Sequence, residues 1–402
     1  MRILIAACVS KRREGGVAGV VYGVGHGLEQ RGHIVKYLFA DDLAGSSYIP
    51  SRFQELEFAI KLARFIRRDP KRFSVVNIHA PAGCAYGMIR SLAPGRKKND
   101  PAYVMTLHGL EERRIRNMGR EAKKGKAVHF SFKNRLWHRF YHMPRFYLSI
   151  KTADHALCVG REVWTMLQLK YNLDPSQTSY SPTGVEEKFF VKRDYFQTTA
   201  TRLLYAGTWL DQRGIFYIRD ALRSLASRLP NLSLTIAGCG SDADSIKKFF
   251  DPTLRPLITV ISMVPSDKMP ALFARDDIFV FPSLMEGTPL VIQEAMASGM
   301  AVITTETCGM IDLIENDFNG LLIQPGDAVA LENAILRLSQ NPQLRARLGQ
   351  AAQETMRRFT WARTIDSVEN AIECALRRVG RESDFLSESF VDRVRARTDD
   401  PT

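Results

Sequence analysis

Short apolar segments that alternate with helical stretches are the feature that most limits how this chain can fold. The first half contains four such segments, "RILIAACV", "HIVKYLFA", "FSVVNIHA" and "AYVMTLH". Helical periodicity fills the intervals between them, at 17–31, 52–68 and 83–92. This alternation indicates a parallel sheet covered by helices on both faces. We therefore expect an α/β fold that is built on a doubly wound sheet.

The same pattern starts again after a charged, turn-rich stretch at 186–200. Its strands are expected in "TRLLYAGT", "LSLTIAG", "LITVIS", "DIFVFPS" and "MAVITTE", with a helix at 213–229. A chain of 402 residues is long enough for two domains that each bury a core. We expect Rossmann-like domains at 1–190 and 191–378, with a polar tail at 379–402. A cleft between the carboxyl ends of the two sheets is then the expected place for a ligand.

Composition agrees with a soluble globular protein, because 45% of the residues are hydrophobic and 25% are charged. The six cysteines form no close pair, which favours reduced thiols over a disulfide framework or a zinc site. The apolar "ILIAACV" near the N-terminus has no small-residue cleavage pattern after it and is interpreted as a buried strand. The reduced thiols lead us to expect a cytoplasmic location. No run of 18 apolar residues exists, so we expect no membrane span.

The net charge of +13 is concentrated in an insert at 111–148, which holds eleven Lys or Arg against three Glu. Phe132, Leu136 and Phe140 recur there at helical spacing, among further aromatic residues. Three interpretations stay open: a core-packing helix with a solvated basic face, an anionic soluble acceptor, or docking on the inner face of an anionic plasma membrane. Nucleic acid is a weaker alternative partner, because no RNA- or DNA-binding motif accompanies the charge.

The segment "SLMEGTPLVIQEAMASG" (283–299) follows a buried strand and passes through a loop into a helix. Thr288 is the expected N-cap and Pro289 the first helical residue. The N–H groups of Leu290 and Val291, with the positive end of the helix dipole, would then form an anion site.

Two carboxylates flank this expected anion site, Glu286 in the loop and Glu294 in the second helical turn. Carboxylates repel phosphate and are better suited to accept hydrogen bonds from hydroxyl groups. A sugar nucleotide offers hydroxyls on both sides of its diphosphate. The pattern therefore favours a nucleotide-sugar ligand.

With its surroundings, "FPSLMEGTPLVIQEAMASGMAVITT", this segment resembles the family 4 glycosyltransferases, retaining enzymes with the two-Rossmann GT-B fold. The resemblance runs over about 1–378 and is strongest in 203–335. Glu286 and Glu294 match the family's pair of glutamates separated by seven residues. The resemblance implies that Glu294 holds the ribose hydroxyls and that Glu286 lies near the donor sugar.

The activity that this resemblance implies is transfer of a hexose from a UDP- or GDP-linked donor to a hydroxyl of a glycan or lipid-linked acceptor, in cell-envelope or exopolysaccharide assembly. The N-terminal domain, which carries the basic insert, would select the acceptor. No metal and no further cofactor is expected. A glycoside hydrolase is a poorer interpretation of the carboxylate pair, because Glu294 is assigned to the ribose side.

The stretch "AGTWLDQRG" (206–214) stands where the family commonly has two cations that hold the diphosphate. The resemblance implies that Gly207, Thr208 and Arg213 line the donor. Arg213 replaces a lysine and keeps the positive charge, and its guanidinium can donate two hydrogen bonds to phosphate oxygens. A purely structural role at the start of the following helix stays open. Thr208 replaces an arginine, so one cation is missing. Three alternatives stay open. The protein binds the diphosphate more weakly, a residue outside this stretch supplies the missing positive charge, or the chain is an inactive homologue.

A glycine-rich loop, "REGGVAGV" (13–20), follows the first strand and leads into a helix. Gly15 and Gly16 would let the backbone approach a ligand, as in the comparable loop of the family. A dinucleotide-binding fingerprint is the rival interpretation, since Asp41 and Asp42 end the second strand. The glycine spacing does not fit that fingerprint, which disfavours a dehydrogenase.

The remaining site residues also come from the resemblance. His108, at the end of a strand, matches the histidine that reaches the donor sugar near the reaction centre. Gly238 lies in "IAGCGSD", which matches the glycine turn near the base, and Gly287 and Thr288 complete the donor-binding set. The expected mechanism is same-face attack, with His108, Glu286 and Arg213 as catalytic residues.

Overall fold

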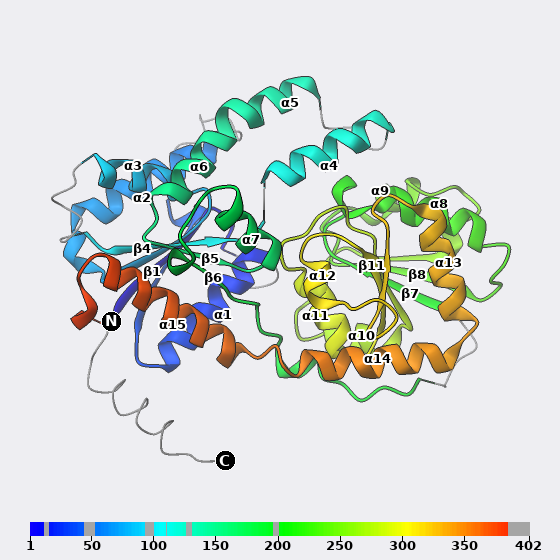
Figure 1. The fold of residues 1–402 in the computed structure, drawn as a ribbon. Helices are drawn as coiled ribbons and strands as arrows, with labels where there is room; N and C mark the ends of the chain where they lie inside the picture. The colour runs from blue at the N-terminus through cyan, green and yellow to red at the C-terminus, as the bar shows by residue number, and fades with distance from the viewer. Residues whose placement is uncertain are drawn as a thin grey trace, which may run out of the picture. The chain divides into compact units, whose positions relative to one another are not determined.

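The computed structural model shows two compact units that each contain one sheet (Figure 1). Unit 1 comprises Met1–His108, Trp137–Pro182 and Trp361–Thr402, and unit 2 comprises Gly109–Leu136 and Thr183–Thr360. The structure describes residues 1–11, 16–43, 53–92, 100–109, 111–125, 131–195 and 201–384. Gly15 and most of the expected polar tail lie outside these ranges.

Unit 1 contains, within the described ranges, a six-stranded sheet in the order β2-β1-β3-β4-β5-β6. Its strands are all parallel and are β1 (Arg2–Ala7), β2 (Ile34–Phe39), β3 (Val75–His79), β4 (Ala102–Leu107), β5 (His155–Cys158) and β6 (Thr178–Tyr180). Every residue of β3, β4 and β5 is buried, as a central parallel strand covered on both faces requires.

Helices cover both faces of this sheet. They are α1 (Gly16–Gln30), α2 (Gln54–Arg68), α3 (Cys84–Ser91), α6 (Met143–Thr152), α7 (Arg161–Leu169) and α15 (Trp361–Arg378). Helices α1 and α15 pack together on one side, and α2, α3 and α6 pack on the other (Figure 1). The sheet is therefore doubly wound.

Unit 2 repeats this architecture with the strand order β12-β11-β10-β7-β8-β9, again counting only the part of the chain that is described. Its parallel strands are β7 (Thr201–Ala206), β8 (Leu232–Ala237), β9 (Ile258–Ile261), β10 (Ile278–Phe281), β11 (Ala301–Thr305) and β12 (Leu321–Ile323). Its helices are α4 (Glu111–Lys123), α5 (Phe132–Trp137), α8 (Ile215–Leu225), α9 (Ala243–Lys248), α10 (Met269–Arg275), α11 (Leu290–Ala297), α12 (Met310–Leu313), α13 (Ala328–Ser339) and α14 (Pro342–Met356). The prediction of two doubly wound parallel sheets is confirmed.

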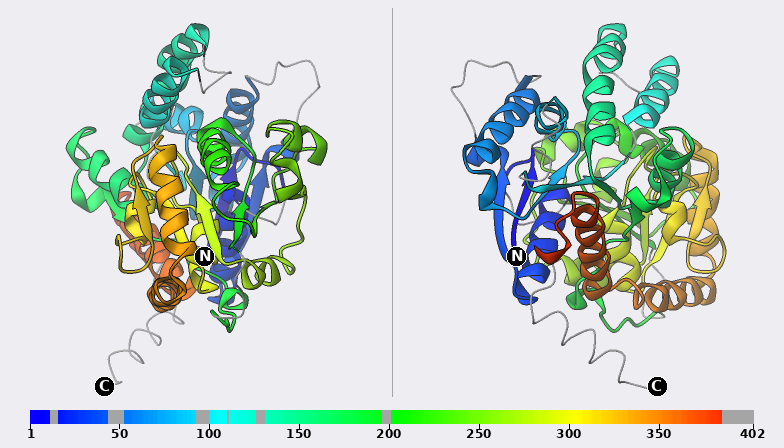
Figure 2. Two further views of the ribbon diagram at one scale, coloured as in Figure 1. Left: turned by 90° about the vertical axis from the view of Figure 1, so that its right-hand side faces the viewer. Right: turned by 60° about the vertical axis from the view of Figure 1, so that its left-hand side comes forward.

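The end of the chain differs from the expected domain assignment, which placed residues up to 378 in the second domain. Helix α15 packs on α1, β4 and β5 of unit 1 (Figure 2). The guanidinium of Arg31, which directly follows α1, donates to the carboxylate of Glu369 on α15, and the His33 ring lies 3.0 Å from the same carboxylate. The last helix returns to unit 1 because its buried apolar face completes that core.

The basic insert at 111–148 is divided between the two units, although the sequence assigned it to the first domain. Helix α4 groups with unit 2, whereas α6 and the π-helical turn η5 (His138–His142) group with unit 1. The chain from α5 through η5 into α6 is one continuous helical run over 132–152.

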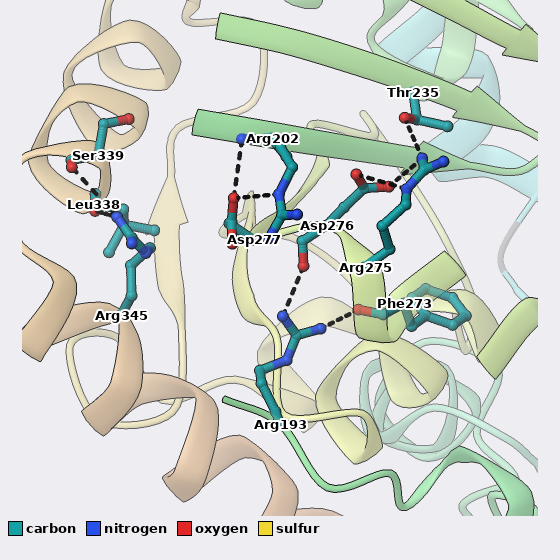
Figure 3. Close-up of polar contacts among 10 residues, drawn as sticks. All are labelled: Arg193, Arg202, Thr235, Phe273, Arg275, Asp276, Asp277, Leu338, Ser339 and Arg345. Carbon is teal, nitrogen blue, oxygen red and sulfur yellow. Dashed lines mark hydrogen bonds and ion pairs between the residues drawn. The ribbon is translucent and has the colours of Figure 1, made fainter. Parts of the chain in front are cut away.

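Arginine side chains hold the amino-terminal edge of the unit 2 sheet (Figure 3). Arg202 forms two hydrogen bonds of 3.0 Å to the carboxylate of Asp277, which joins the starts of β7 and β10. Arg193 donates to the carbonyls of Asp276, at 2.7 Å, and of Phe273. Each guanidinium satisfies backbone or carboxylate oxygens that burial would otherwise leave unpaired. This edge is structural, so a ligand site is expected at the opposite, carboxyl-terminal edge.

Candidate active site

An ion pair joins the loops that follow β7 and β10 at the carboxyl edge of unit 2. Arg213 Nη1 lies 3.3 Å from Glu286 Oε1, and the guanidinium carbon lies 5.2 Å from the centre of the Phe281 ring. The hydroxyl of Ser283 donates to the same carboxylate oxygen at 3.2 Å. Burial raises the pKa of Glu286, and the Arg213 charge opposes that shift. Two motifs that are far apart in the sequence thus meet.

Glycines allow this close approach of the two loops. Gly214 has a φ of 76°, and a Cβ there would lie 2.0 Å from the carbonyl oxygen of Pro282. Gly207 has a φ of 126°, and a Cβ there would lie 3.3 Å from Arg213 Nη1. Both positions therefore require glycine for conformation, and Gly214 requires it for space as well.

The loop after β11 fixes the backbone beside Glu286. The N–H of Gly309 donates to the Glu286 carbonyl at 3.1 Å, and a Cβ at Gly309 would lie only 1.6 Å from the Gly287 carbonyl oxygen. The hydroxyl of Thr305 donates to the Ser283 carbonyl. Sequence reasoning missed Gly309, because a single glycine after a strand gives no signal of what it will pack against.

The start of α11 differs from the expected one. Pro289 is the N-cap residue, with a non-helical ψ of 93°, and the helix spans Leu290–Ala297 without a side-chain cap hydrogen bond. The assignment of Thr288 as N-cap was therefore wrong by one residue. Leu290 and Val291 are still the first two helical residues, whose N–H groups have no acceptor within a helix.

Glu294 lies on α11 with its carboxyl in a low-dielectric setting. Burial and the negative charge of Glu186 raise its pKa to about 8, and the positive charge of Lys188 opposes the shift. Lys188 Nζ itself lies 2.8 Å from the Glu186 carboxylate. Within the described ranges, no hydrogen bond or ion pair reaches the Glu294 carboxyl. A partly buried carboxyl in this state suits a ligand that donates hydrogen bonds.

Two other predicted residues of unit 2 lie in turns at the same edge of the sheet. The carbonyl of Thr208 accepts a hydrogen bond from the Tyr205 hydroxyl at 2.8 Å, which anchors the turn after β7. Gly238 follows β8 with a φ of 62°, and its N–H donates to the Ile261 carbonyl at 2.9 Å. The predicted donor residues of unit 2 therefore all follow strands β7, β8 and β10.

Unit 1 contributes a histidine pair. His79 ends β3, and its Nδ1 lies 2.7 Å from Nε2 of His108, which follows the neighbouring strand β4. The rings are stacked with centroids 4.8 Å apart. Burial lowers the pKa of His108 to about 4 and that of His79 well below its usual value. Both rings are therefore neutral at pH 7, and one hydrogen between them links their tautomers.

His79 is a residue that the sequence analysis missed. The signal that identifies it is the strand order, since β3 and β4 are neighbours and their carboxyl ends meet at one edge. Gly16, the other predicted residue of unit 1 in the described part, is the first residue of α1 and has a φ of 56°.

Membrane-spanning helices and clustered metal ligands are both absent from the described residues. These residues contain no helix that is long and apolar enough to cross a membrane. They also contain no group of three or more His, Cys, Asp or Glu side chains arranged to hold a metal ion.

Solved structures share this architecture. Sucrose-phosphate synthase from Thermosynechococcus elongatus superimposes with a TM-score of 0.72 at 19% identity, over 96% of this chain and 100% of that one. HepE from Anabaena, solved with UDP-glucose, has a TM-score of 0.66 at 16% identity, over 93% and 99% of the two chains. Two doubly wound parallel sheets, as in these structures, define the fold class of the GT-B glycosyltransferases.

Sequence comparison gives the family. The model described as "Glycosyltransferase Family 4" matches residues 14–189, and "Glycosyl transferases group 1" matches 187–355. The Escherichia coli enzyme named UDP-Gal:alpha-D-GlcNAc-diphosphoundecaprenol alpha-1,3-galactosyltransferase is 22% identical over 365 residues, which cover 85% of this chain and 86% of that enzyme. The chain belongs to the family 4 glycosyltransferases, and the protein is an enzyme of that type.

Proposed function

We propose that the protein is a retaining glycosyltransferase that moves a hexose from a UDP- or GDP-linked donor to a hydroxyl of a glycan or lipid-linked acceptor, in cell-envelope or exopolysaccharide assembly. The observation that carries this proposal is the Glu294 carboxyl, which is partly buried, has a raised pKa and forms no hydrogen bond or ion pair in the described part of the chain. Ribose hydroxyls supply the missing hydrogen bonds. UDP is the preferred nucleotide, because the E. coli relative is named for UDP-Gal and HepE was solved with UDP-glucose.

The groups around Glu294 and Glu286 suit the rest of such a donor. The N–H groups at the start of α11, from Leu290 and Val291, face the diphosphate. Arg213 binds the diphosphate from the other side. The ion pair with Glu286 fixes the orientation of the Arg213 guanidinium. Glu286 accepts from a hydroxyl of the donor sugar.

Transfer then proceeds by attack on the same face of the sugar that the leaving group departs from. The bond between the anomeric carbon and the diphosphate oxygen breaks, and the acceptor oxygen bonds to that carbon. The acceptor proton passes to the departing diphosphate. Arg213 and the α11 amides stabilise the charge that grows on the diphosphate, which is where electrostatic catalysis contributes most. Neutral His108 hydrogen-bonds a sugar hydroxyl.

A thermal-shift screen over UDP-, GDP- and ADP-sugars tests this function. A ligand at a hundred times its dissociation constant stabilises the folded state by about 2.7 kcal/mol. We expect one nucleotide series to raise the melting temperature of the wild type, and Glu294→Ala to lose that response. No response of the wild type to any sugar nucleotide would refute the proposal.

The protein is also proposed to act at the cytoplasmic face of the plasma membrane, docked peripherally through the helical run 132–152. Phe132 and Phe140 are 70% and 72% exposed, and Lys133, Arg135 and Arg139 are exposed among them. In α6, at the far end of the run, Phe146 and Ile150 are buried in unit 1. The core-packing interpretation of the insert therefore describes only α6. Exposed aromatic side chains among cations fit the headgroup region of an anionic membrane. Attraction to the anionic lipids contributes about 1 kcal/mol of binding free energy per basic residue.

Liposome co-sedimentation tests the docking. We expect binding to anionic but not neutral vesicles, lost at high salt and lost when Lys133, Arg135 and Arg139 are replaced by Glu. The same charge change at the exposed Arg67, Arg68 and Lys71 of unit 1 is the matched control and is expected to retain binding. Equal loss in both triple variants, or no binding at low salt, would contradict docking through this run.

A further inference from the structure

Helix α4 presents one stripe of polar side chains to the rest of unit 2. Arg113, Asn117 and Glu121 are spaced four residues apart, so they share one face of the helix. Glu121 is only 5% exposed, and its carboxylate accepts from the Tyr217 hydroxyl and lies 3.1 Å from Lys124 Nζ. A carboxylate is buried at a surface only where partners compensate its lost hydration. This face of α4 therefore packs against the rest of unit 2 and is not a solvated basic face.

The other two residues of the stripe contact the loops that hold Glu286. Asn117 Nδ2 donates to the Leu284 carbonyl at 2.8 Å, two residues before Glu286. Arg113 Nη2 donates to the Thr307 hydroxyl at 3.0 Å. Thr307 lies two residues before Gly309, whose N–H donates to the Glu286 carbonyl. Helix α4 thus contacts both segments that fix the position of this carboxylate.

The charge of Arg113 lies at the edge of the sheet where one cation is missing. Thr208 stands where the family commonly has an arginine, which leaves Arg213 as the cation of that stretch. Strands β7, β10 and β11 are consecutive neighbours, and Arg213 follows β7 while Thr307, the partner of Arg113, follows β11. Arg213 therefore contacts Glu286 from the loop after β7, whereas Arg113 contacts the loop after β11, on the other side of β10.

We propose that α4 is part of the donor site: Arg113 brings the second positive charge to the diphosphate of the donor, and Asn117 is a positioning residue for the loop that carries Glu286. This inference rests on the proposed function, since it assigns a further contact to the same nucleotide-sugar donor. The basic insert then serves two purposes, with α4 at the donor and the run 132–152 at the membrane.

Titration of the full-length protein with UDP and with uridine tests the role of Arg113. Arg113→Ala is expected to weaken UDP binding about tenfold or more, as loss of a charge-assisted phosphate contact does, and to leave uridine binding unchanged. Arg113→Lys keeps the charge and is expected to recover part of the loss. Arg120→Ala is the matched control, because Arg120 is an exposed arginine of the same helix. Melting temperatures confirm that each variant is folded.

The outcomes separate this inference from the function on which it rests. If Glu294→Ala loses UDP while Arg113→Ala binds it as Arg120→Ala does, α4 is not part of the donor site and the proposed function stands. Unchanged UDP binding with a raised KM for an anionic acceptor leads to the same conclusion. If the wild type binds no UDP, GDP or ADP sugar, both proposals fail.

Asn117 is tested by separating kcat from donor affinity. Asn117→Ala is expected to lower kcat for sugar transfer with UDP affinity within about twofold of the wild type, because the loop carrying Glu286 loses its anchor while the diphosphate contacts remain. Asn117→Asp, which keeps the size but not the amide donor, is expected to behave like the alanine variant. Wild-type kcat in both variants would overturn the positioning role.

Discussion

Arg213 and Glu286 are joined by an ion pair of 3.3 Å, although they come from the loops after different strands. The cation expected at the diphosphate and the carboxylate expected at the donor sugar thus constrain one another. A change at either residue frees the partner as well as removing its own contact. Their contributions to transfer are therefore expected to be coupled.

A double-mutant cycle measures this coupling. Arg213→Ala is expected to weaken UDP binding, and Glu286→Gln to lower kcat with UDP still bound. Because the pair is largely buried, the double variant should differ from the sum of the single effects on transfer by about 0.5–3 kcal/mol. Additive effects on kcat/KM, within error, would show that the two residues act independently.

Nucleotide binding is expected to release a proton from Glu294. Its pKa of about 8 keeps the carboxyl mostly protonated at pH 7, and ribose hydroxyls donate to the ionised form. Calorimetric titration of UDP at pH 7 in buffers of different ionisation enthalpy should detect this release, and Glu294→Gln should abolish it. Equal proton release by both proteins would exclude Glu294 as the source.

The same carboxyl makes stability depend on pH with a defined sign. The pKa of Glu294 is about 8 in the folded protein against a usual value of 4.5, so the folded state binds more protons than the unfolded state between these values. This group therefore lowers the free energy of unfolding as the pH rises from about 5 to about 8. Glu294→Gln should flatten that decline in denaturant titrations at several pH values. Parallel curves for both proteins would contradict it.

His79 is expected to act through His108. Replacing His79 by Phe removes the hydrogen-bond partner of His108 Nε2 and should change the ¹⁵N NMR signature of the His108 tautomer. We expect kcat to fall with UDP affinity unchanged, and His79→Gln to recover part of the activity. An unchanged tautomer in His79→Phe would refute the coupling of the two rings.

Gly309 is expected to tolerate no side chain. In Gly309→Ala the new Cβ would meet the Gly287 carbonyl oxygen, so the Glu286 loop must shift, at a cost of about 1–3 kcal/mol of stability and with loss of transfer. Gly109→Ala is the matched control, because its Cβ would have ordinary contact at 4.0 Å. Wild-type activity of Gly309→Ala would show that the loop adapts without consequence.

Local sequence patterns determined the two parallel sheets and the loop-to-helix segment that carries Glu286 and Glu294. These features depend on neighbouring residues, because apolar runs, helical periodicity and glycine positions act over a few residues. The start of α11 was misplaced by one residue, since Thr288 is a good N-cap type but the backbone of Pro289 occupies that position. The roles of the site residues remain predictions.

Only the tertiary structure decided which distant segments meet. Helix α15 returns to unit 1, α4 contacts the Glu286 loop, and His79 stacks on His108. None of these contacts has a local signal, because each depends on strand order and on which apolar face finds a matching surface. The sequence thus specified the elements and the chemistry of single residues, while packing between segments far apart in the chain determined which of them act together.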